Sequence, residues 1–377
     1  MKKSKLRTII IIIVLLVFGL LFFNKFIGET PDKAEIKAVA LKVDNSEVIN
    51  SGITSIGYQS IKVRVLKGKY EGEKFTAVNQ FTGKAEIDNY FKEGDKLLVA
   101  IKEKGNQVTA VKVIDLYRQG WELSLFLIFV IVLLIYARIV GVMALFSFVT
   151  SIYIIWNLLI PGLLAGYNPL LLASFTLIIL TALIIFSIAG LTKKGLAAFT
   201  GTVTGLLITI IITLFFGNKL GLQGMTAPFS QALLFSGHMD LNMKHIFFAS
   251  IVIGASGAAM DIAMDIAASI AEIKAQKPEI EMRELIESGF NVGRAVIGTM
   301  TTTLLLAYSG GYLTLLMLFS SKSTSLSRMI NFKMVAAEIL RTLTGSIGLV
   351  LVAPITAVLA GWIYSINFKE VIGWKKD

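Results

Sequence analysis

The sequence has no cysteine and only two histidines among its 377 residues. The lack of cysteine excludes a disulfide framework, a thiol nucleophile and a thiolate metal site. Two histidines, His238 and His245, argue against a metal centre built from imidazole ligands. Nothing in the sequence resembles a phosphate-binding loop, a nucleotide-binding fold or a serine triad. We therefore expect no enzyme activity, no catalytic residue, no bound metal and no cofactor.

Charged side chains are also scarce. They make up 16% of the chain, whereas soluble domains carry about a quarter. Several uninterrupted apolar runs exceed about 18 residues, the length that crosses a bilayer. The sequence therefore predicts an α-helical polytopic membrane protein, surrounded by lipid, with about eight transmembrane helices. They are expected near residues 9–23, 122–138, 140–160, 169–190, 195–216, 246–271, 294–319 and 334–364.

The chain opens with MKKSKLR, and an apolar run follows. That run ends in FFNKF rather than at a small-residue cleavage site, so residues 1–27 are predicted to be an uncleaved anchor helix. Residues 28–120 hold five short runs rich in Val, Ile and Lys, separated by Gly, Asn and Asp. This pattern is typical of strands and turns. It predicts a small all-β domain, similar to an oligonucleotide/oligosaccharide-binding barrel, inserted after the first helix. Residues 121–377 are predicted to form the membrane domain.

The net charge of +11 comes mainly from basic residues beside the apolar runs. It is therefore read as a topology signal and not as a nucleic-acid surface. With eight crossings, one side of the membrane receives both termini and the connections that hold 14 Lys and Arg residues. The positive-inside rule then predicts a multi-pass cell-membrane protein with cytoplasmic termini. It places residues 28–120 outside the cytoplasm.

One predicted helix carries carboxylates within the apolar sequence GASGAAMDIAMDIAASIAEI, residues 254–273. Asp261, Asp265 and Glu272 fall on one helical face. Gly254 and Gly257 beside them would let a neighbouring backbone approach closely. An ionised Asp at mid-bilayer costs about 2.5–3.5 kcal/mol on insertion scales. We therefore expect this face to be buried among helices, away from lipid.

The three carboxylates are interpreted as a proton or cation relay. Two carboxylates one turn apart in a poorly hydrated site favour holding a proton between them. The alternative is that Asp261 and Asp265 only join helices by hydrogen bonds to Ser and Thr. Supporting polar groups are expected on the following helices. One group is Thr301, Thr302 and Thr303, although a Thr hydroxyl often bonds to the backbone of its own helix. The other is Glu338 with Arg341, which would form either a gate or an ordinary ion pair.

A metal site is conceivable in HMDLNMKH, residues 238–245, but the ligand spacing is not compact. We prefer a helix start there, capped by Asp240 or Asn242.

The 254–273 segment, the eight-helix layout and the β-rich domain together resemble the YibE/F family of bacterial membrane proteins. That resemblance implies a multi-pass membrane protein, often regarded as a transporter. Residues 254–306 are more distantly similar to the core of SecD/SecF proteins and resistance-nodulation-division permeases. The similarity lies in GAAMD at 257–261, LIESGFNVGRA at 285–295 and TTTLLLA at 301–307. It implies that Asp261 is a proton-carrying carboxylate.

The leading hypothesis is a cation-coupled permease, or the energising subunit of one, with an unknown small-molecule or ion as substrate. The small-residue faces suggest pairing with a second copy or with a paralogue. The alternative is a membrane scaffold whose β domain binds a partner in the cell envelope. An intramembrane aspartyl protease needs carboxylates on facing helices, whereas Asp261 and Asp265 share one helix.

Overall fold

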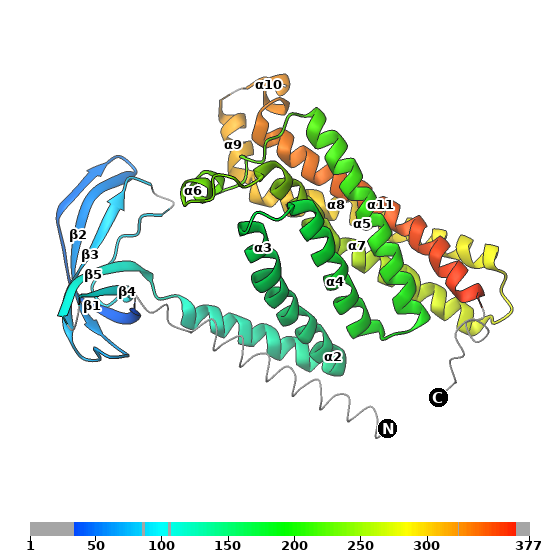
Figure 1. Cartoon of the computed structure of the whole chain (residues 1–377), viewed down its shortest axis with the longest axis horizontal. Helices are drawn as coiled ribbons and strands as arrows, with labels where there is room; N and C mark the ends of the chain where they lie inside the picture. Colours follow the sequence, from blue (N-terminus) through cyan, green and yellow to red (C-terminus); the bar gives the residue numbers. More distant parts are fainter. Residues whose placement is uncertain (1–33, 85–86, 105–106, 323, 367–377) are drawn as a thin grey trace. The chain divides into compact units, whose positions relative to one another are not determined.

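The structure is a computed structural model that describes residues 34–84, 87–104, 107–322 and 324–366. The anchor helix predicted at residues 1–27 therefore lies outside the described residues. The chain divides into two compact units, which meet in the sequence at Arg138. Figure 1 identifies their elements.

The first unit contains a closed β-barrel, as the sequence predicts. In its described part, the strands follow one another around the barrel in the order β1-β2-β3-β5-β4. All neighbours are antiparallel except β3 and β5, which pair in parallel. The strands are β1 (Ala34–Ser51), β2 (Thr54–Val65), β3 (Lys74–Thr82), β4 (Lys96–Lys104) and β5 (Gln107–Leu116).

The barrel closes because alternate side chains point inward and exclude water. Along β2 the pattern of exposed and buried residues repeats every two positions, with Ile61, Val63 and Val65 inside. They pack on residues such as Leu97 and Val99 of β4. Burial of this aliphatic set supplies about 1.5–3 kcal/mol for each large side chain. Strand lysines such as Lys42, Lys62 and Lys112 are exposed on the outside.

One inward position of the barrel holds a glutamine. Gln59 is fully buried, and its amide nitrogen donates to the Phe91 carbonyl at 2.9 Å and to Asn45 Oδ1 at 2.8 Å. Its amide oxygen accepts from the Phe91 N–H and from Asn79 Nδ2, both at 3.2 Å. These bonds hold the segment that leads into β4 against the barrel.

A long helical stretch follows the barrel. It comprises α2 (Gln119–Ile154), η1 (Ile155–Leu159) and α3 (Ile160–Leu164). Its 46 residues would extend about 69 Å if straight, more than twice the thickness of a bilayer core. However, Arg138 has φ 49° and ψ −118°, which no helix contains. This break separates the two helices predicted at 122–138 and 140–160.

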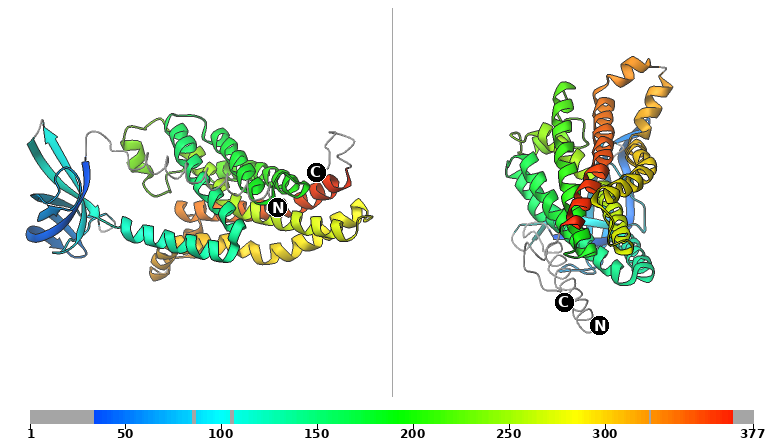
Figure 2. Two further views of the ribbon diagram at one scale, coloured as in Figure 1. Left: turned by 90° about the horizontal axis from the view of Figure 1, so that it is seen from below. Right: turned by 90° about the vertical axis from the view of Figure 1, so that its right-hand side faces the viewer.

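The second unit is a helical bundle (Figure 1). The helix α7 packs against α5 and α11, and α8 lies along α11 (Figure 2). Beyond α3, its helices are α4 (Pro169–Ala189), α5 (Lys193–Lys219), α6 (Ser230–Phe235), α7 (Met243–Gln276), α8 (Met282–Gly311), α9 (Leu313–Ser321), α10 (Leu326–Ile330) and α11 (Lys333–Ser365).

The number of crossings can be compared with the prediction. Within the described residues, five helices are long and apolar enough to cross a membrane, or six if α8 and α9 form one span bent by 69°. The sequence predicts about eight. One of these, residues 9–23, lies outside the described residues, and two others are the parts of the stretch broken at Arg138. The helix predicted at 294–319 corresponds to the bent pair.

Glycines bring α5 and α11 into close contact. A Cβ on Gly201 or Gly205 of α5 would collide with Thr356 or Val352 of α11. In the other direction, a Cβ on Gly348 of α11 would collide with Thr209. Small residues four apart therefore set this helix crossing, as is common within membranes.

Candidate functional site

The three carboxylates of α7 share one face, and no other part of the described chain covers that face. Between residues 251 and 272 the exposed residues of α7 are Gly254, Gly257, Asp261, Asp265 and Glu272. We call this set the acidic stripe. The prediction of a single polar face is confirmed. The expectation that neighbouring helices of the same chain bury it is wrong.

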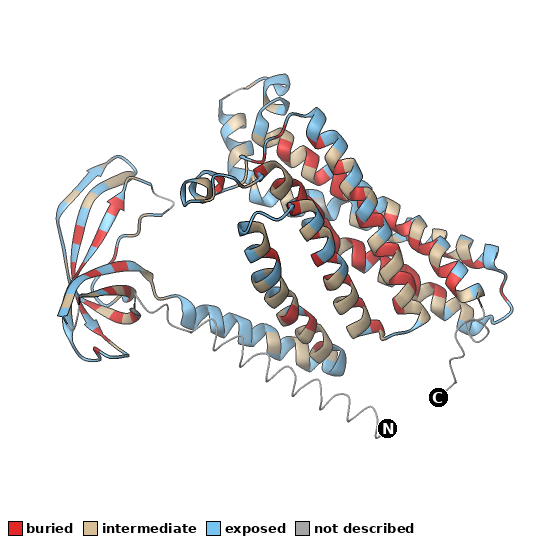
Figure 3. Cartoon of the chain, in the orientation of Figure 1, coloured by how far each residue is buried: buried red, intermediate tan, exposed pale blue. Residues whose placement is uncertain are grey.

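The reason lies in which side of α7 the bundle covers. The opposite face holds Ile262, Ile266 and Ile270, which are fully buried. They pack in the common core with residues of α5 and α11 (Figure 3). The aliphatic face gains more from packing than a face of glycines and aspartates, so the bundle leaves the acidic stripe uncovered.

The carboxylates of Asp261 and Asp265 form no ion pair or hydrogen bond with other side chains in the described part of the chain. At Asp265 the backbone carbonyl, and not the carboxylate, accepts a hydrogen bond from the Ser269 hydroxyl at 2.9 Å. The alternative role, joining helices of this chain through Ser and Thr, therefore has no contact to support it. Glu272, nearer the end of α7, accepts from Gln276 at 2.9 Å.

At its other end the acidic stripe reaches α8. A Cβ on Gly254 would stand 2.6 Å from the hydroxyl oxygen of Tyr308, so a side chain at this position would displace the hydroxyl. That hydroxyl is buried and has no hydrogen-bond partner among the described residues. Asp261 lies seven residues further along α7, about 10 Å away along the axis. Sequence analysis did not identify Tyr308.

Tyr308 also contacts a charged pair on α11. Arg341 Nη1 lies 3.3 Å from Glu338 Oε1, and the two side chains are 19% and 15% exposed. The guanidinium carbon lies 5.5 Å from the centre of the Phe247 ring and 5.7 Å from that of Tyr308. The pair suggested by the spacing of Glu338 and Arg341 is thus present. It is held between aromatic rings of α7 and α8.

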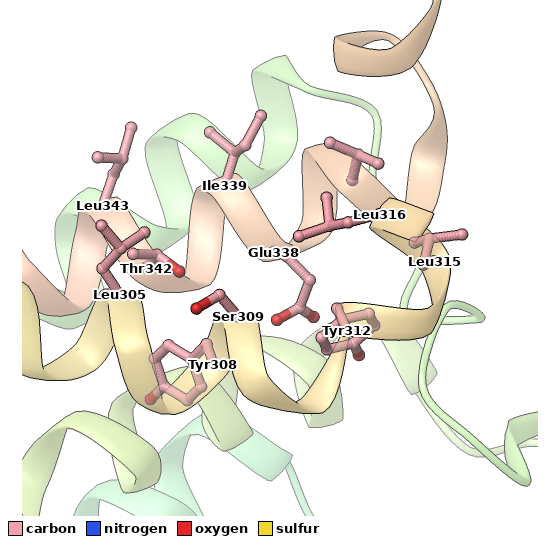
Figure 4. Close-up of a pocket in the computed structure, with 11 residues that line it drawn as sticks. Leu305, Tyr308, Ser309, Tyr312, Leu315, Leu316, Glu338, Ile339, Thr342 and Leu343 are labelled. Atoms are coloured by element: carbon pink, nitrogen blue, oxygen red, sulfur yellow. The ribbon is translucent and has the colours of Figure 1, made fainter. Parts of the chain in front are cut away.

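A cavity of about 290 Å³ lies beside this pair, between α8, α9 and α11. Figure 4 shows the Glu338 carboxylate beside Tyr312, with Ser309 and Tyr308 on the neighbouring turns. Most of the other lining side chains are aliphatic. They are Leu305, Leu315, Leu316, Val335, Ile339 and Leu343, and Thr342 adds a hydroxyl.

The remaining predicted polar residues do not join this cluster. Thr301, Thr302 and Thr303 are exposed on α8. The first two hydroxyls donate to backbone carbonyls of their own helix, at 2.7 and 3.3 Å, and the third contacts Met300 Sδ at 3.9 Å. This is the usual behaviour of Thr within a helix, and it leaves these hydroxyls little capacity for a relay.

The HMDLNMKH segment forms the start of α7. The Asn242 side chain accepts from the His245 N–H at 3.0 Å, which makes Asn242 the N-cap. This is one of the two capping residues expected. In the described part of the chain, no three His, Asp or Glu side chains lie close enough together to hold a metal ion.

Two models of one protein family match the chain, one over most of the helical part and one over the barrel. The model of the YibE/F-like protein family matches residues 125–366, and that of the YibE/F family N-terminal domain matches residues 30–116. No curated protein and no solved structure gives a significant match. The resemblance to SecD/SecF proteins and resistance-nodulation-division permeases is not shown by these matches and stays a prediction.

Proposed function

The chain belongs to the YibE/F family, and we propose that it is a cation-coupled membrane permease or the energising subunit of one. In this proposal the acidic stripe of α7 carries protons. The substrate is a small molecule or ion.

The observation that carries the proposal is the composition of the one uncovered face of α7. This helix is the most buried of the spans in the described chain, yet its open face exposes Asp261 and Asp265. Turned toward lipid, each ionised aspartate costs about 2.5–3.5 kcal/mol. A sequence with no use for these carboxylates would place leucine there. Access to water or to another polar surface removes the cost and lets the carboxylates take up and release protons.

The polar residues extend along much of α7. From Gly254 to Glu272 the acidic stripe covers 19 residues of helix, or about 27 Å along the axis, close to the thickness of a bilayer core. Tyr308 connects the Gly254 end to Glu338 and Arg341. We place that end on the outer side and Glu272 on the cytoplasmic side, with cytoplasmic termini and an extracytoplasmic barrel. Such a path offers a proton entry and an exit.

The open face also needs a cover in the membrane. Beyond the adjoining turns of α7 itself, nothing in the described chain lies within 4 Å of the position where a Gly257 Cβ would stand, although glycine costs about 1 kcal/mol relative to alanine inside a helix. A backbone from outside the chain would use this space. We propose a second copy or a paralogue as the cover.

A scaffold function is the second candidate, and the barrel supports it. At the tip of the β1–β2 hairpin, Ile49, Ile53 and Ile56 are 63%, 94% and 47% exposed. An apolar tip of this kind suits contact with an envelope partner. In a scaffold, the carboxylates of α7 would not be needed for activity.

Proton flux separates the two functions. Proteoliposomes with the wild-type chain should acidify under an imposed gradient faster than empty vesicles. Asp261→Asn should reduce that rate, and Asp261→Asn with Asp265→Asn should abolish it while folding is kept. Glu279→Gln removes an exposed carboxylate outside the helices and should leave the rate unchanged. Full flux in the double variant would overturn the relay, and absence of flux in the wild-type chain would favour the scaffold.

A further inference from the structure

The cavity between α8, α9 and α11 has a single charged side chain among its lining residues. That residue is Glu338. Arg341 is not part of the lining, and its guanidinium contacts one carboxylate oxygen, Oε1, and the rings of Phe247 and Tyr308. The cation is thus directed away from the cavity. The cavity itself presents a carboxylate.

The second oxygen of this carboxylate is not satisfied by a hydrogen bond of ordinary geometry. Glu338 Oε2 is buried and accepts no such bond from the described residues, although the Tyr312 hydroxyl interacts with the same carboxylate. Leaving a buried acceptor without a donor is unfavourable, and more so when the acceptor is charged. An ionised carboxylate can only accept hydrogen bonds, so the group that satisfies Oε2 must be a donor.

The other lining residues indicate the chemistry of the rest of the molecule that carries this donor. Aliphatic side chains from three helices form most of the lining, and the rings of Tyr308 and Tyr312 lie beside the carboxylate (Figure 4). A cavity of about 290 Å³ is at the small end of ligand sites, which are mostly apolar with a few placed polar groups. A cation beside a tyrosine ring gains further attraction.

We propose that this cavity binds a small apolar molecule carrying a protonated amine, whose ammonium donates to Glu338 Oε2. The hydrocarbon part lies among the leucines of α8 and α9, and the tyrosine rings flank the ammonium. The proposal concerns binding alone and does not depend on transport or on the acidic stripe.

Two probes of equal size test it. 4-Phenylbutylamine and 4-phenylbutan-1-ol are titrated calorimetrically into the full chain in nanodiscs of neutral lipid, with protein-free discs subtracted. The amine should bind at least about tenfold more tightly than the alcohol, because both can donate a hydrogen bond to the carboxylate but only the ammonium also forms an ion pair with it. Glu338→Gln should bring the amine down to the affinity of the alcohol.

A second variant keeps the test decisive if Glu338→Gln fails to fold. Ile339→Trp fills the cavity and leaves Glu338 and Arg341 in place, so both probes should lose binding. Glu279→Gln, outside the helices, should alter neither. Equal affinity for amine and alcohol would mean that any apolar molecule fills the cavity. That result, or unchanged amine binding in Ile339→Trp, would overturn the proposal.

Discussion

The hydroxyl of Tyr308 occupies the space that a side chain at Gly254 would need. A Cβ at position 254 would stand 2.6 Å from the hydroxyl oxygen but 3.7 Å from the ring carbon that bears it. The fit between α7 and α8 at this level therefore depends on one missing methyl group and one oxygen atom. It also joins the acidic stripe to the aromatic surroundings of Arg341.

This relationship predicts how the two positions respond to substitution. Gly254→Ala should lower the free energy of unfolding by up to about 2 kcal/mol, because overpacking costs about 1–3 kcal/mol and the gain in helix propensity offsets about 1. Removing the oxygen by Tyr308→Phe should relieve the loss. Gly257→Ala, which meets open space, is the control and should not destabilise. Denaturant titration in mixed micelles compares the three single variants with the double variant Gly254→Ala with Tyr308→Phe. A loss of stability that persists in the double variant would contradict the contact.

The open face predicts an intermolecular contact at Gly257. The chain has no cysteine, so Gly257→Cys introduces a single thiol. If a second copy covers the acidic stripe about a two-fold axis, oxidation in native membranes should give a disulfide-linked dimer. Ile211→Cys is the control, because Ile211 is 65% exposed on an apolar face of α5. Cross-linking should be absent or weak there. Equal cross-linking at both positions would indicate random collision and not an interface.

The barrel should lose stability in acid through Asp88. Desolvation acts to raise the pKa of this carboxyl. However, hydrogen bonds from the Thr82 N–H and hydroxyl and from the Lys84 N–H, at 2.9–3.0 Å, together outweigh it, so the pKa lies below its ordinary value. The stabilisation is therefore complete above the ordinary pKa and is lost as the pH falls through the lowered one.

Amide hydrogen exchange measures this effect locally. Protection of the Thr82 and Lys84 amides, corrected for the intrinsic pH dependence of exchange, should fall below about pH 4 in the wild-type chain. Asp88→Asn should show less protection at neutral pH and a weaker change in acid. Glu71→Gln, at an exposed site, should follow the wild type. A wild-type profile in Asp88→Asn would contradict the assignment.

Gln59 should be the most sensitive polar residue of the barrel. Gln59→Leu leaves the N–H and C=O of Phe91 without their partner and removes one of the two hydrogen bonds that the Asn79 amide donates. Each unsatisfied buried group costs about 1–3 kcal/mol, so the total loss should be about 2 kcal/mol or more. Gln80→Leu, on the exposed face of β3, should stay within about 0.5 kcal/mol. Thermal unfolding of the full chain compares the two, and equal effects would contradict the network.

Local patterns anticipated much of the architecture. The alternation in residues such as Ile61, Val63 and Val65 depends only on the two-residue repeat of a strand, so the barrel could be predicted. The placement of Asp261 and Asp265 on one face follows likewise from the helical repeat. Neither pattern shows what lies opposite a side chain. The inward position of Gln59 could therefore be predicted from the alternation, but its hydrogen-bond partners, up to 32 residues away, could not.

The amino-acid sequence is sufficient to predict that the chain enters a membrane, that a barrel precedes the helical bundle, and that carboxylates line one side of α7. These properties follow from composition and from periodicities within single segments. Three other properties appear only once the helices are packed: the bundle leaves the carboxylate side uncovered, Tyr308 fits over Gly254, and Glu338 faces a cavity. Each of these depends on which helices pack together, and that choice is a balance of buried areas over residues far apart in the chain.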